Sequence, residues 1–124
     1  MVASIAPWLE DGHVLLVCPD SIDHETWSRE NGNPRQRIEL HEKWFRYVTG
    51  ELLPRGVEFG ADDRKAIVTG CSMGGVHAGN FFFRRPDLFD TLVSLSGTFD
   101  ASFFFHDYMD DYGATCTGSI RLKS

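Results

Sequence analysis

A serine between glycines stands at the centre of the sequence. The pattern G-x-S-x-G, followed by one further glycine, is formed by Gly70, Cys71, Ser72, Met73, Gly74 and Gly75. In a nucleophile elbow this pattern exposes a serine hydroxyl on a sharp turn between a strand and a helix, where it can attack a carbonyl carbon. The backbone N–H of the next residue, Met73, would be one of two donors to the resulting oxyanion. The alternative is a Gly-Ser turn that only joins a strand to a helix.

The residues on either side of Ser72 favour the elbow. An apolar, β-branched run at 66–71 leads into the turn, and a helical pattern over 76–84 leaves it. Gly70 and Gly74 are expected because the strained turn brings neighbouring backbone too close for side chains. Three consecutive phenylalanines at 81–83 predict that the outgoing helix is buried on most sides.

A serine hydroxyl is a weak nucleophile, so Ser72 needs a base within hydrogen-bond reach. His106, in an acidic and aromatic segment after the last predicted strand, is one candidate, and His24, in a long polar loop, is another. The alternative is that His106 is only a solvated histidine beside carboxylates and that His24 is only a surface residue of its loop. His77, five residues after Ser72, is directed along the helix, so it is a weaker candidate for the base, and its plainer role is to pack or cap. His13 and His41 have no predicted role.

Three segments are predicted to be parallel β-strands, namely 13–18, 66–71 and 91–96. The first is a continuous apolar run, as expected for a strand that is covered on both faces. Helical spacing of apolar residues predicts helices over 2–11 and 34–53. Alternating strands and helices predict an α/β fold with right-handed crossovers and three layers, α/β/α.

Composition excludes several classes of function. The 124 residues suffice for one domain with a real core, and the net charge of −6 without a basic stripe excludes a nucleic-acid partner. No apolar run has membrane-spanning length and no signal-peptide pattern appears, so we expect a cytoplasmic protein with no membrane partner. Cys18, Cys71 and Cys116 lack metal-binding spacing, so neither a metal, a disulfide framework nor a cofactor is predicted.

The elbow, the turn Arg85-Pro86-Asp87-Leu88-Phe89 and the segment Leu95-Ser96-Gly97 together resemble a known family. They are similar to the esterases of the α/β-hydrolase superfamily that are related to esterase D and the mycolyltransferases. The resemblance implies a partial α/β-hydrolase domain over 1–111, followed by a poorly structured tail at 112–124. It also implies that Ser72 attacks the carbonyl of a small-molecule ester or thioester. Either water or an alcohol could then take the acyl group, and the residues do not separate hydrolysis from acyl transfer.

Members of that family carry further segments that this sequence does not show. An upstream central strand supplies the second oxyanion N–H, and loops further downstream supply the acid and the histidine of the catalytic triad. We therefore expect a fragment, truncated or frame-shifted, with weak or no esterase activity. The alternative from another class is a non-catalytic module. Unpaired sheet edges invite association, so such a module would form homo-oligomers through them.

Overall fold

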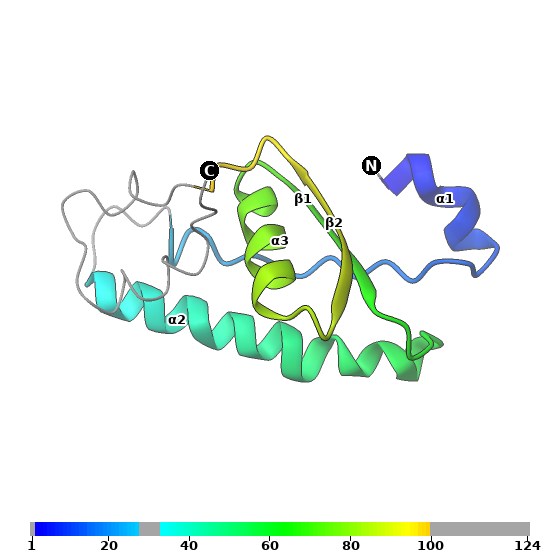
Figure 1. The fold of residues 1–124 in the computed structure, drawn as a ribbon, viewed down its shortest axis with the longest axis horizontal. Helices are drawn as coiled ribbons and strands as arrows, with labels where there is room; N and C mark the ends of the chain where they lie inside the picture. Colours follow the sequence, from blue (N-terminus) through cyan, green and yellow to red (C-terminus); the bar gives the residue numbers. More distant parts are fainter. Residues whose placement is uncertain (1, 28–32, 100–124) are drawn as a thin grey trace.

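The computed structural model describes residues 2–27 and 33–99 (Figure 1). In chain order the elements are α1 (Val2–Glu10), α2 (Pro34–Tyr47), the π-helical turn η1 (Val48–Leu52), the 3-10 turn η2 (Pro54–Phe59), β1 (Ala66–Cys71), α3 (Met73–Arg84) and β2 (Phe89–Leu95). The strand predicted at 66–71 is confirmed, and so is the helix that follows it. The strand predicted at 91–96 begins two residues earlier. None of the helices in the described ranges is long and apolar enough to cross a lipid bilayer.

Strands β1 and β2 form a parallel two-stranded sheet that α3 joins and covers on one face (Figure 1). Val68 lies beside Leu92 in the register, and both are partly buried. The residues between them point to the opposite face of the sheet, where Ile67 is 68% exposed and Leu95 is 51% exposed. The described part of the chain is therefore a partial α/β fold with one covered sheet face. The prediction of three layers is wrong, because no described helix packs on the second face.

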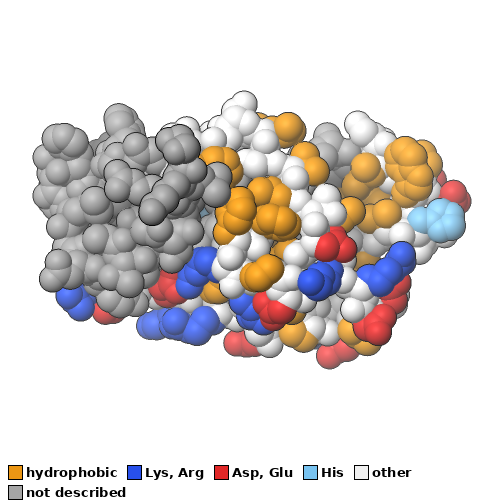
Figure 2. Space-filling model, viewed as in Figure 1, with side chains coloured by type: hydrophobic (Ala, Val, Ile, Leu, Met, Phe, Trp, Pro, Cys, Tyr) orange, Lys and Arg blue, Asp and Glu red, His pale blue; other side chains and the backbone are white. Residues whose placement is uncertain are grey.

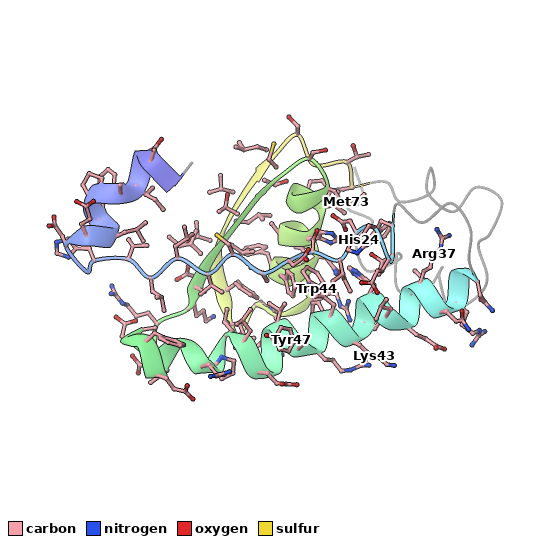
Figure 3. The ribbon with its side chains drawn as sticks, turned by 180° about the vertical axis from the view of Figure 1, so that it is seen from behind. His24, Arg37, Lys43, Trp44, Tyr47 and Met73 are labelled. Atoms are coloured by element: carbon pink, nitrogen blue, oxygen red, sulfur yellow. The ribbon has the colours of Figure 1, made fainter. Side chains whose placement is uncertain are left out.

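The strand predicted at 13–18 is also wrong. Within the described ranges, residues 14–20 belong to no helix or strand, and Val14, Leu15 and Val17 are exposed. The segment passes across the side of the molecule that faces the viewer in Figure 3. A strand exists only by pairing with another strand, and an apolar run alone does not supply that partner.

The helix predicted over 34–53 is confirmed as α2 and its continuation in η1. The Asn33 side chain caps it by accepting from the Arg35 N–H at 2.9 Å, and Pro34 suits its first turn. The core lies where α2, α3 and the sheet meet, and it consists of Trp44, Phe45, Val48, Phe81 and Phe89. Charged side chains gather along the lower edge of Figure 2, over α2, whereas hydrophobic ones reach the surface over α3 and near α1.

A partly buried ion pair joins α2 to α3 beside this core. Arg84 donates two hydrogen bonds of 2.8 Å to the Glu42 carboxylate, and its guanidinium carbon lies 3.8 Å from the centre of the Phe45 ring. Burial alone would raise the pKa of Glu42, but the hydrogen bonds and charge of Arg84 hold that pKa below its ordinary value. The pair thus fixes the helix that follows Ser72 against α2.

Candidate active site

Ser72 occupies the turn between β1 and α3 in a strained conformation. Its φ of 54° and ψ of −121° lie in a region that non-glycine residues rarely adopt. The Ser72 N–H donates to the Leu95 carbonyl at 2.8 Å, and the Ser72 carbonyl accepts from the Gly75 N–H at 2.9 Å. The residue is exposed. A nucleophilic serine on a strand–helix turn requires this combination of strain, backbone anchoring and exposure.

The glycines around Ser72 differ in whether an added Cβ atom would have room. A Cβ atom at Gly70 would overlap the carbonyl group of Gly74, and one at Gly75 would lie 2.7 Å from Ser94 Oγ. Both positions therefore need glycine for close packing. A Cβ at Gly74 would meet nothing within 4 Å, so the expectation that close backbone also requires glycine there is wrong. Cys71, on the uncovered face of β1, is an exposed free thiol.

Two unpaired N–H groups lie next to Ser72. Met73 and Gly74 open α3, and in the described structure neither N–H donates to a protein acceptor, whereas those of Gly75 and Val76 bond to the Ser72 carbonyl. A helix N-terminus carries partial positive charge, and its first N–H groups have no partner within the helix. Met73 and Gly74 can therefore offer N–H groups to an oxyanion at this end of α3.

No histidine of the described ranges makes a hydrogen bond to Ser72. His24 lies at the same end of α3 as Met73 (Figure 3), but its side chain is 73% exposed and is 3.4 Å from Glu25. His77 is buried and is bonded to Asp23 rather than to Ser72. His106 lies outside the described residues. The described site thus brings Ser72 together with the N–H groups of Met73 and Gly74, but not with a base.

A partly buried polar cluster joins the 20–27 loop, α2 and α3, and the sequence pattern did not predict it. His77 Nε2 is 2.7 Å from Asp23 Oδ1, and the Trp27 indole N–H donates to His41 Nδ1 at 3.2 Å. Burial and, to a smaller extent, the neighbouring His77 together lower the pKa of His41 to about 4. The sequence did indicate that His41 is buried, because its spacing places it on the apolar face of α2 with Ile38 and Trp44. Nothing local in the sequence pairs it with Trp27 or with α3.

The described part of the chain holds no group of three or more His, Cys, Asp or Glu side chains arranged for a metal ion. No curated protein and no solved structure matched the chain. Comparison with models of protein families matched residues 8–116 to the family described as "Putative esterase". This match includes Ser72, the turn that holds it and all of α3. The chain belongs to this esterase family.

Proposed function

We propose that Ser72 is the nucleophile of an esterase-like hydrolase that acts on small carboxylic esters or thioesters. The observation that carries the proposal is the strained, exposed turn at Ser72, with φ of 54°, beside the free N–H groups of Met73 and Gly74 in a chain of the esterase family. Gly70, Cys71 and Gly75 complete the proposed nucleophile elbow around this serine. No other described residue combines exposure, strain and helix N–H groups in this way.

The proposed reaction has two stages. The Ser72 Oγ adds to the carbonyl carbon while a base takes its proton, and the Met73 N–H stabilises the oxyanion. The C–O bond to the leaving alcohol then breaks, the alcohol receives the proton, and an acyl-serine remains. Water attacks that acyl group and releases the carboxylic acid, restoring the serine. Transfer to an alcohol follows the same path, with the alcohol in place of water.

We expect this chain to react slowly. The described residues place no base within reach of Ser72, so among them only the oxyanion donors and substrate binding can accelerate the reaction. Preorganised N–H donors are worth roughly 100-fold or more in complete serine hydrolases. A rate that depends on Ser72 also needs a base, and His106 and His24 are the candidates that we propose for it.

Hydrolysis of a short-chain chromogenic ester tests the proposal. We expect the rate to exceed that of Ser72→Ala by about tenfold or more. Ser96→Ala is the matched control, because Ser96 has the same φ of 54° and follows β2 as Ser72 follows β1. It should leave the rate unchanged. Equal rates for the unmodified chain and Ser72→Ala would contradict the proposal.

Two follow-up measurements extend a positive result. Loss of the serine-dependent rate in His106→Ala or in His24→Ala would identify the proposed base. Adding a simple alcohol to the reaction would distinguish the two fates of the acyl group, because acyl transfer yields a new ester where hydrolysis yields only the acid.

A second candidate function, self-association, is favoured by the uncovered sheet face. Ile67, Val93 and Leu95 expose apolar side chains there, and within residues 2–27 and 33–99 no further strand pairs with the outer edges of the sheet. We propose a second copy of the chain as the partner.

Sedimentation velocity should then show concentration-dependent dimers that Ile67→Glu abolishes. Val57→Glu, at a residue 64% exposed in η2 away from the sheet, should leave them intact. A monomer at every concentration would contradict this candidate.

A further inference from the structure

The loop at 20–27 is attached to the two long helices by three hydrogen bonds. The Trp44 indole N–H donates to the Asp20 carbonyl at 2.7 Å, Asp23 is 2.7 Å from His77, and Trp27 donates to His41. Polar groups of three chain segments, the loop, α2 and α3, therefore meet in a partly buried site. Since buried polar groups are costly when unpaired, the protonation states of the His41 and His77 imidazoles decide whether the loop stays in place.

The hydrogen bonds fix the protonation of His41. Because the Trp27 N–H donates to its Nδ1, that nitrogen carries no proton, and the neutral ring has its N–H on Nε2. Asn80 faces Nε2 with its side-chain nitrogen at 3.4 Å, while its amide oxygen is buried without a hydrogen-bond partner. A half-turn of the amide brings the oxygen to the Nε2–H and satisfies both groups. We therefore assign a continuous relay from Trp27 through His41 to Asn80.

A second proton on His41 would disrupt this relay. Nδ1 would become a donor facing the Trp27 N–H, so the hydrogen bond between Trp27 and His41 would be lost. The positive charge would also face His77 and Arg84 on α3, with the His77 ring stacked 5.4 Å from that of His41. The two nearby carboxylates are engaged already, since Glu42 on the same helix binds Arg84 and Asp23 on the loop binds His77.

We propose that Asp23, Trp27, His41, His77 and Asn80 form an acid-sensitive latch, and that protonation of His41 releases the 20–27 loop from α2 and α3. The loop carries His24 and borders the end of α3 at which Met73 lies (Figure 3). Release would therefore change the surroundings of the candidate active site without unfolding the core. The latch does not depend on whether Ser72 is catalytic.

The pKa of His41 gives the direction and range of the effect. The latched state holds this pKa at about 4, against an ordinary value of 6.5, so the released state binds the proton more tightly. The latch is therefore at full strength above about pH 6.5 and weakens as the pH falls toward about 4. In the acid limit, the gap between these two pKa values corresponds to a weakening of the latch on the order of 100-fold.

Hydrogen exchange on the intact chain tests the latch. Backbone protection in peptides from 20–27, corrected for the pH dependence of intrinsic exchange, should fall by at least about tenfold between neutral pH and about pH 4. Peptides from β1 should keep their protection over the same range. Asn at position 41 offers an acceptor near the place of Nδ1 but does not titrate, so His41→Asn should abolish the acid-induced loss.

Three outcomes would overturn the proposal. The first is that the 20–27 loop of His41→Asn loses its protection in acid as the unmodified chain does. The second is that the loop of the unmodified chain keeps its protection between neutral pH and about pH 4. The third is that β1 loses its protection together with the loop. If His41→Asn does not fold, an NMR titration of the unmodified chain decides instead. The imidazole signals of His41 should then titrate together with the backbone signals of the 20–27 loop. Independent titration of the two sets of signals would also reject the latch.

Discussion

Replacement of Gly70 by alanine should lower the free energy of unfolding by about 3 kcal/mol, the upper range for overpacking at a closely packed position. The added Cβ would overlap the main-chain carbonyl group of Gly74, which cannot rotate away as a side chain can. Relief would require moving either the end of β1 or the first turn of α3. Gly70 is paired with Ser94 in the sheet, so both strands would be affected. Urea unfolding followed by circular dichroism measures the change.

Gly74→Ala is the matched control, four residues further along the same turn. Nothing lies within 4 Å of its added Cβ, and the residue is already in the first turn of α3. Because alanine favours helix over glycine by up to about 1 kcal/mol, the stability should stay the same or rise. Similar losses from both substitutions would show that the elbow does not pack as described.

Phe81→Ala should have the second large effect, a loss of about 3–5 kcal/mol. Phe81 is buried where α2, α3 and the sheet meet, and its ring stacks on that of Phe45 at 5.0 Å and lies 5.2 Å from that of Trp44. Removing the ring would leave a cavity among other large rings that cannot collapse into it. The midpoint of urea unfolding should fall, without a change of slope if unfolding remains two-state.

Phe83→Ala tests whether this loss comes from burial rather than from helix propensity. Phe83 is on the same helix two residues later, but it is 41% exposed. We expect its removal to cost less than about 1 kcal/mol. A loss comparable to that of Phe81→Ala would contradict the position of the core. The expectation that α3 is buried on most sides is confirmed, since residues 75–81 are all buried and Phe83 lies on the remaining exposed side.

The parts of the fold that the sequence predicted well have local causes. The β-branched run, the glycine at 70 and the helical spacing after Ser72 define β1, the turn and α3 within twenty residues. Likewise, Asn33 and Pro34 provide a cap and a first turn for α2. Each of these signals acts between residues that are close in the sequence, so no knowledge of the tertiary arrangement was needed.

The remaining features depend on contacts between distant segments. Whether 13–18 forms a strand depends on a neighbouring strand, which its own apolar residues cannot specify. The cluster of Asp23, His41 and His77 joins three segments up to 54 residues apart, so each histidine considered alone resembled an ordinary helical residue. Similarly, the sequence pattern could not distinguish the crowded Gly70 from the open Gly74.

Covalent labelling with a serine-directed fluorophosphonate tests the role of Ser72 most directly, because it needs an activated hydroxyl but no complete catalytic cycle. We predict one label per chain, mapped by mass spectrometry to the peptide that contains Ser72. The label should be lost in Ser72→Ala and kept in Ser96→Ala. No label on Ser72, under conditions that label another serine esterase, would contradict its assignment as the nucleophile.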